Sequence, residues 1–202
     1  MLITFPLTVT LYELFAGRPV TTLLLSKLGM IPPRQRDFIA SAKQSGILWA
    51  NVTRHIPEPD RSVRVVYTSH MLEHLDRDEA VHFLKEARRV LRPGGVIRIA
   101  VPDLRYHVDN YLKQKDADKF VDGLLMAHAV DRTLFARLRH LWTGGRQHKW
   151  MYDGESLCKL LSATGFQDPR VMESGTTRID DPGELNLRER EPESVFVEAV
   201  NP

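Results

Sequence analysis

Residues 62–101 carry the clearest fold signal in the chain: SVRVVYTSHMLEHLDRDEAVHFLKEARRVLRPGGVIRIAV. Ser62–Ser69 is a short β-branched run of the kind that forms a buried strand. Asp76 then begins a helix, and Glu79 three residues later completes a capping box. Val96–Val101 reads as a second buried strand. Strand, helix and strand joined by short links predict a parallel sheet with a right-handed crossover.

The helix after Asp76 has one apolar side, which we expect to face the core. Four of its residues recur at spacings of four, three and four, namely Ala80, Leu84, Ala87 and Leu91. Pro93-Gly94-Gly95 is expected to stop this helix. Pro102 ends the second strand, and Asp103 is placed to cap a further helix that runs to Leu112.

The flanking sequence predicts more elements of the same kind. Helices are expected at Val20–Leu28, Arg34–Lys43, residues 117–142 and Gly154–Thr164, and strands at Ile47–Val52, Phe166–Met172 and Ser194–Val200. Gly165 closes the last helix in a left-handed conformation. The polar residues 173–193 form a loop long enough to be either a functional lid or disordered.

Length and composition point to one ordinary globular domain. The chain has 202 residues, 43% of them hydrophobic and 27% charged, so we expect a single domain over residues 1–202. Within it, residues 1–46 form an atypical helical segment. The single cysteine, Cys158, lies in an apolar helical stretch and is interpreted as a packing residue rather than a nucleophile.

Charge and hydropathy narrow the possible partners. A formal net charge of +2 is too small to indicate a nucleic-acid partner. No apolar run approaches the roughly 18 residues that span a bilayer, and the apolar amino terminus lacks the basic region and cleavage site of a signal peptide. These features predict a cytoplasmic protein.

The run from Asn51 to Leu112 resembles the class I methyltransferases that use S-adenosylmethionine (SAM), in particular small bacterial members of methyltransferase type 11 linked to sugar or envelope-polymer biosynthesis. NVTRHIPEPDRSVRVVYTSHMLEHL (51–75) and DEAVHFLKEARRVLRPGGVIRIAVPDL (78–104) carry the resemblance. It continues through HKWMYD (148–153) and the final two strands. It implies an α/β fold with a Rossmann-like sheet and a C-terminal antiparallel hairpin.

The resemblance also implies where the cofactor binds. The carboxyl end of the predicted strand Ile47–Val52 and the loop after it approach the adenine, and the amide of Asn51 there is able to hydrogen-bond the base edge. Ser69, His70 and Met71 lie at the carboxyl end of the strand that faces the methyl-donor pocket.

The glycine-rich loop that opens such domains is not found, so the sheet is expected to be incomplete at its amino-terminal side. Glu13 to Gly17 is a degenerate substitute for that loop, or else part of a helix-turn-helix lid. The missing loop leaves two hypotheses open: a SAM-dependent methyltransferase, or an inactive methyltransferase-like binding or assembly module. It also exposes one edge of the Ser62–Ser69 strand, which Ile47–Val52, Leu7–Leu11 or a second copy of the chain in a homodimer is expected to cover.

Two motifs carry candidate chemistry. His70-Met-Leu-Glu73-His74 has the H-x-x-E-H spacing of inverted zinc proteases, but it starts directly after a strand and precedes a new helix cap, so no metal ligand is predicted.

In the second motif, His148 is the candidate catalytic base for a hydroxyl. Lys149, Trp150 and Tyr152 are candidate substrate-binding residues, the two rings being suited to stacking on a sugar. Trp150 is alternatively a packing residue of this loop. Together the sequence predicts O-methyl transfer from SAM to a sugar or related small metabolite.

Overall fold

The computed structural model describes residues 50–126 and 147–202. From Thr53 onward these residues belong to one compact unit, which comprises Thr53–Ala129 and Arg146–Pro202. Ala50–Val52 belong to a second unit, most of which lies outside the described residues. The single-domain interpretation and the helices expected in residues 1–46 therefore stay predictions.

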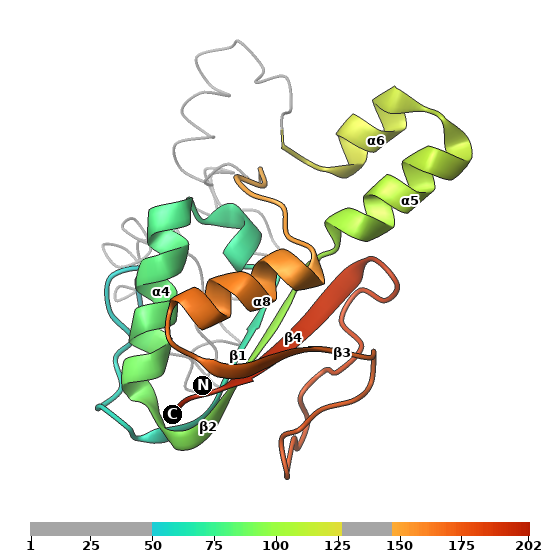
Figure 1. Cartoon of the computed structure of the whole chain (residues 1–202). Helices are drawn as coiled ribbons and strands as arrows, with labels where there is room; N and C mark the ends of the chain where they lie inside the picture. Colours follow the sequence, from blue (N-terminus) through green and yellow to red (C-terminus); the bar gives the residue numbers. More distant parts are fainter. Residues whose placement is uncertain (1–49, 127–146) are drawn as a thin grey trace, which may run out of the picture. The chain divides into compact units, whose positions relative to one another are not determined.

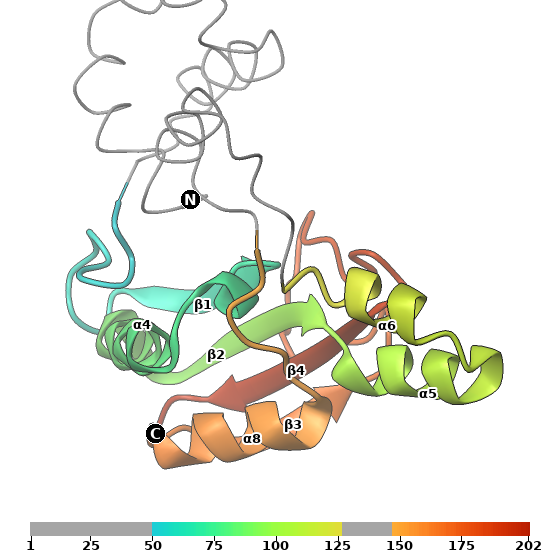
Figure 2. The same cartoon turned by 90° about the horizontal axis from the view of Figure 1, so that it is seen from above.

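A four-stranded mixed sheet forms the centre of the larger unit (Figures 1 and 2). The strands are β1 (Val63–Ser69), β2 (Leu91–Pro102), β3 (Gln167–Met172) and β4 (Ser194–Val200), in the order β1-β2-β4-β3. β1 and β2 are parallel, and β4 is antiparallel to both β2 and β3. The α/β class, the parallel pair and the C-terminal antiparallel hairpin are thus confirmed.

Four α-helices accompany the sheet in the described residues: α4 (Arg77–Val90), α5 (Leu104–Gln114), α6 (Ala117–Gly123) and α8 (Gly154–Ala163). Asp76 and Glu79 form the predicted capping box at the start of α4, and the Asp103 side chain caps α5. Gly165 has the expected left-handed backbone, with φ of +90°. Local sequence signals therefore predicted these helix ends correctly.

The predicted apolar side of α4 is buried in the core. Its buried residues are Ala80, Phe83, Leu84, Ala87 and Val90. The helix ends at Val90, and Pro93-Gly94-Gly95 lie inside the irregular first part of β2 instead of in a separate turn. The Asn201 side chain donates to the carbonyl oxygens of Leu91 and Arg88 there, at 2.7 and 3.2 Å. The end of α4 is therefore closed by a residue from the far end of the chain.

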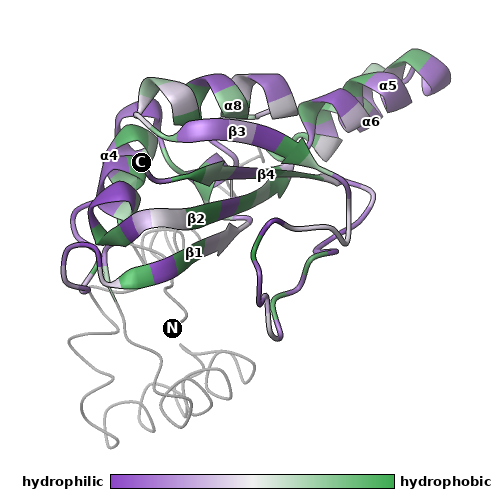
Figure 3. Cartoon of the chain, turned by 60° about the horizontal axis from the view of Figure 1, so that its bottom comes forward, coloured by the Kyte–Doolittle hydropathy of each residue, from purple (hydrophilic) through white to green (hydrophobic). Residues whose placement is uncertain are grey.

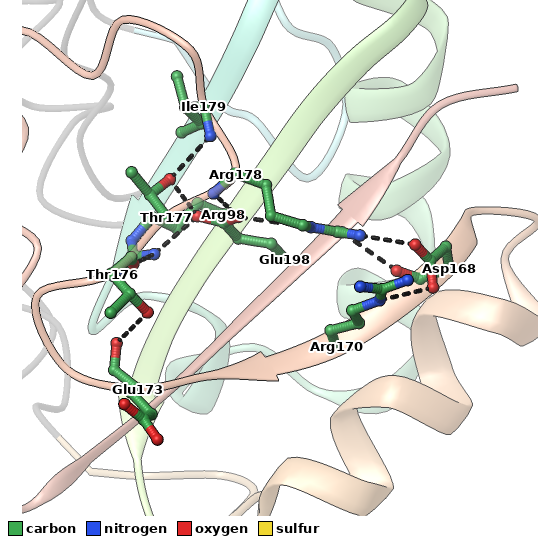
Figure 4. Close-up of polar contacts among 9 residues, drawn as sticks. All are labelled: Arg98, Asp168, Arg170, Glu173, Thr176, Thr177, Arg178, Ile179 and Glu198. Carbon is green, nitrogen blue, oxygen red and sulfur yellow. Dashed lines mark hydrogen bonds and ion pairs between the residues drawn. The ribbon is translucent and has the colours of Figure 1, made fainter.

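The two faces of the sheet are covered differently. Gly154, at the start of α8, lies against Val171 and Val195, so α8 covers the face to which these valines belong. On the other face Arg98 and Glu198 form a fully buried ion pair, with Nη1 and Oε1 2.7 Å apart (Figure 4).

This ion pair binds the long loop 173–193. Arg98 donates to the carbonyl oxygens of Thr176 and Leu187, at 2.8 and 3.2 Å. Glu198 accepts hydrogen bonds from the Thr177 hydroxyl and the Arg178 backbone N–H. The interpretation of this loop as disordered was wrong, because charged groups on the sheet hold it in place.

Other expectations met different outcomes. Residues 50–52 are not in a strand, so the carboxyl end of the predicted strand Ile47–Val52 was wrong and the rest lies outside the described residues. In the described part of the chain β1 pairs only with β2, and the expected pairing of its other edge with Leu7–Leu11 or a second copy stays a prediction.

Figure 3 shows hydrophobic and hydrophilic residues mixed along α5 and α6, neither of which has a buried residue.

Candidate functional site

The candidate site begins where the parallel strands β1 and β2 end side by side. Ser69 is in register with Ala100, and the backbone N–H of His70 donates to the carbonyl oxygen of Ala100 at 2.9 Å. His70 has a left-handed backbone, with φ of 49°, a conformation that is costly for a residue other than glycine and is common at functional sites. Met71 is buried and precedes the 3₁₀ turn η1 (Leu72–His74). Ser69, His70 and Met71 therefore lie at the predicted edge, while their contact with a cofactor stays a prediction.

A second segment, residues 147–152, crosses the same edge of the sheet. The backbone N–H groups of Lys149 and Trp150 both donate to the carbonyl oxygen of Glu73, at 2.8 and 3.1 Å. Tyr152 forms an isolated β-bridge with Asp103, and its backbone carbonyl oxygen accepts a hydrogen bond from the Leu104 N–H at 2.8 Å. These backbone contacts bring the candidate base His148 next to the turn that follows β1.

Three imidazoles gather around the Glu73 carboxyl group. The Nδ1 atom of His70 lies 3.4 Å from Glu73 Oε1, and the Nε2 atom of His74 lies 3.7 Å from the same oxygen. The rings of His74 and His148 meet edge to face, with their centroids 5.0 Å apart. Glu73 is 1% exposed and His148 is 6% exposed, so both are shielded from water.

The histidines of this cluster are oriented by neighbouring oxygens. Nδ1 of His74 lies 3.0 Å from the carbonyl oxygen of Gln147. Nε2 of His70 lies 3.0 Å from the hydroxyl of Ser194, at the start of β4. Burial lowers the pKa of His148, and the nearby Glu73 carboxyl group opposes that shift only in part. Burial thus favours the uncharged form of the His148 imidazole.

The predicted substrate-binding residues are placed unequally. Lys149 extends its Nζ to Glu79 Oε2 at 3.0 Å. Trp150 is 44% exposed, and its ring lies under the Arg77 guanidinium at 4.8 Å. Tyr152 is fully buried, and burial raises the pKa of its phenol. Tyr152 thus has no exposed ring face for the predicted stacking on a sugar, whereas Trp150 has one.

The structure describes some of the other residues that the sequence analysis singled out. Gly17 lies outside the described residues, and Asn51 lies in the other compact unit. His70 and His74 do not share a helix, since η1 begins at Leu72, so the protease-like reading of H-x-x-E-H is wrong. Burial raises the pKa of the Cys158 thiol, which agrees with a packing role.

Sequence reasoning did not single out Glu73 as a central residue of the site. The H-x-x-E-H spacing was the available signal, but it was weighed only as a helical motif. His148 lies 75 positions after Glu73 in the chain, and no local pattern joins the two residues.

Comparison with known protein families finds a match to part of the chain. Residues 32–99 match the model of a family described as a methyltransferase domain. The match covers about a third of the chain and includes β1, η1, α4 and most of β2. The turn that carries Glu73 and His74 is thus within the matched region. No curated protein matches the sequence.

Several solved methyltransferase structures are similar to this chain at low identity. A SAM-dependent methyltransferase from Thermotoga maritima, described as a possible histamine N-methyltransferase, is 18% identical with a TM-score of 0.49, over 84% of this chain and 70% of that one. A SAM-dependent methyltransferase from Methanosarcina mazei is 18% identical with a TM-score of 0.47, over 85% and 79%. Human N-acetylserotonin methyltransferase in complex with SAM is 15% identical with a TM-score of 0.42, over 76% of this chain and 33% of that one.

Within residues 50–126 and 147–202, no helix has the length and apolar character needed to cross a membrane.

Proposed function

We propose that this protein is a SAM-dependent methyltransferase that methylates a hydroxyl group of a sugar or sugar-linked metabolite. The observation that carries the proposal is the match of residues 32–99 to the methyltransferase domain family. The described geometry supports it, because ligands of open α/β sheets bind beyond the carboxyl ends of the parallel strands. His70, Glu73, His74 and His148 gather at that edge.

The residues at the end of β1 suit such a cofactor. Ser69 and His70 are half-buried there and Met71 is buried, so a hydroxyl, an imidazole and an apolar surface adjoin one another. SAM combines an amino acid, a ribose and an adenine, which call for these kinds of partner. When bound, it supplies an electrophilic methyl group.

For this reaction the chain has to align the acceptor hydroxyl with the methyl group and activate it. The acceptor hydroxyl loses its proton, its oxygen forms a bond to the methyl carbon, and the carbon–sulfur bond breaks to release S-adenosylhomocysteine. Holding the oxygen in line with that bond supplies much of the rate. We assign activation of the hydroxyl to His148, because it is buried at this edge and burial lowers its pKa. The exposed face of Trp150 is the surface on which a sugar ring stacks.

Isothermal titration of the purified chain with SAM, and with S-adenosylhomocysteine as a second ligand, tests the proposal. Dissociation constants on the order of micromolar are expected for both ligands, and an acceptor screen over sugars and sugar-linked metabolites then follows. If a folded sample binds neither ligand at concentrations on the order of millimolar, the protein is an inactive methyltransferase-like binding module.

A further inference from the structure

We propose that Glu73, His74 and His148 bind one divalent transition-metal ion, and that zinc is the ion which best fits these donors. One ligand atom from each residue lies within 4.8 Å of the other two. Glu73 and His74 come from the turn after β1, and His148 comes from the segment that crosses the sheet edge. The backbone bonds from Lys149 and Trp150 to Glu73 hold the two parts together.

The first reason is that the Glu73 carboxyl group is buried without a hydrogen-bond donor. Neither of its oxygens has a hydrogen-bond partner among the described residues, and the side chain is 1% exposed. The nearest ring nitrogens, at 3.4 and 3.7 Å, are beyond the usual length of a charge-assisted hydrogen bond. A buried polar group without partners is costly. A cation bound by Glu73 would remove that cost.

The second reason is the orientation of His74. The Gln147 carbonyl oxygen only accepts hydrogen bonds, so Nδ1 of His74, 3.0 Å away, must carry the hydrogen. In the neutral ring the lone pair is then on Nε2, which is the atom that faces Glu73 Oε1. Histidines that bind metals usually donate their other ring N–H to a carbonyl or carboxyl oxygen in this way.

The third reason is His148. Its Nδ1 atom is buried and has no hydrogen-bond partner among the residues that the structure describes. The ring packs edge to face on His74. The two imidazoles therefore offer neighbouring ligand atoms for one metal ion.

Two nitrogens and one carboxyl oxygen form the three-ligand set of many catalytic zinc sites, in which the fourth position holds water or substrate. Zinc bonds of about 2.0–2.2 Å place tetrahedral ligand atoms about 3.3–3.6 Å apart. Atoms that now lie within 4.8 Å of one another need to approach by about an ångström, a change that side-chain rotation provides. His70, whose Nε2 is engaged with Ser194, is a positioning residue for Glu73 in this arrangement.

The metal site changes how His148 acts. A bound ion would hold the acceptor oxygen and lower the pKa of its hydroxyl, which would pass its proton to solvent water before the oxygen attacks the methyl group. His148 then activates the acceptor as a ligand of the ion and does not take the proton itself. This role rests on the proposed methyltransferase function, whereas binding of the ion does not.

The test is a zinc titration of the full chain in the absence of SAM and acceptor. The protein is freed of any affinity tag, treated with a chelator, and titrated against a chromophoric zinc chelator. One equivalent of zinc is expected per chain, and cobalt(II) in its place is expected to give the visible absorption of a site with imidazole ligands. Glu73→Gln, His74→Ala and His148→Ala should each weaken binding at least about tenfold, since even groups that only orient ligands have effects of 10–100-fold.

His55→Ala is the matched control. His55 also lies next to a carboxyl group, with its Nδ1 3.0 Å from Glu86 Oε2, but its side chain is 65% exposed and it is not part of the cluster. This variant should bind zinc as the unchanged protein does. Circular dichroism of each variant verifies that the fold is retained.

Substoichiometric binding by the unchanged, folded protein would overturn the metal site, whatever the variants do. Equal affinity in the three ligand variants and the control would overturn it too, because the ion would then bind elsewhere. Zinc binding together with failure to bind SAM would leave the metal site standing and reject the methyltransferase proposal. The reverse result would reject the metal site alone.

Discussion

The buried pair of Arg98 and Glu198 makes a strong stability prediction. Both side chains are 0% exposed, and they face each other across β2 and β4 (Figure 4). In Glu198→Ala, the Arg98 guanidinium stays buried without a carboxylate partner among the described residues and keeps hydrogen bonds to the carbonyl oxygens of Thr176 and Leu187. Removal of one member of a buried pair costs about 3–5 kcal/mol. That is a large share of the total stability of an ordinary domain, which is about 5–15 kcal/mol.

Urea denaturation followed by fluorescence and circular dichroism measures this loss, and coincidence of the two probes verifies a single transition. The double variant Arg98→Met/Glu198→Leu should recover most of the lost free energy, because apolar residues of similar volume often replace a buried pair without cost. Trypsin should also cleave Glu198→Ala faster within residues 173–193, since Glu198 binds Thr177 and the Arg178 N–H.

The exposed pair of Glu155 and Lys159 provides the control. Its side chains are 77% and 74% exposed, so Glu155→Ala should leave the denaturation midpoint almost unchanged. A loss below about 1 kcal/mol in Glu198→Ala, comparable to that of an exposed pair, would refute the reasoning that the buried carboxyl group compensates the charge of Arg98.

Three further predictions follow from other parts of the structure. His148→Ala should retain SAM binding in calorimetry but lose methyl transfer to any acceptor found in the screen; unchanged turnover would remove His148 from the reaction. Hydrogen bonds from Arg89 lower the pKa of Glu86 from 4.5 to about 2, so the stability that Glu86 contributes is present above pH 4.5 and is lost as the pH falls toward 2. Denaturation midpoints across that pH range should therefore fall less steeply in Glu86→Gln, and parallel slopes would contradict this. Gly95→Ala should destabilise the fold by about 1–3 kcal/mol, because its Cβ would lie 2.9 Å from the Arg92 carbonyl oxygen and 3.0 Å from that of Arg64. Thermal unfolding measures the loss, and an unchanged midpoint would show that the backbone yields there.

The sequence by itself determined the elements that depend on short-range signals. A short β-branched run marked β1 and an alternating apolar pattern marked β4, while Asp76 and Asp103 marked helix starts that the structure has at those positions. These signals act within a few residues of the chain, so they can be recognised without knowledge of the fold. The parallel order of β1 and β2 followed from the helix between them.

Only the tertiary structure decided which distant groups meet. The Glu73 carboxyl group acquires its histidine neighbours because residues 147–152 bond to the backbone of the turn after β1. Arg98 and Glu198, 100 positions apart, become a buried pair because β4 inserts between β2 and β3. Tyr152 is buried in the core although the same loop exposes Trp150. Burial, ring orientation and charge pairing are set by packing between segments far apart in the chain, and no local pattern encodes them.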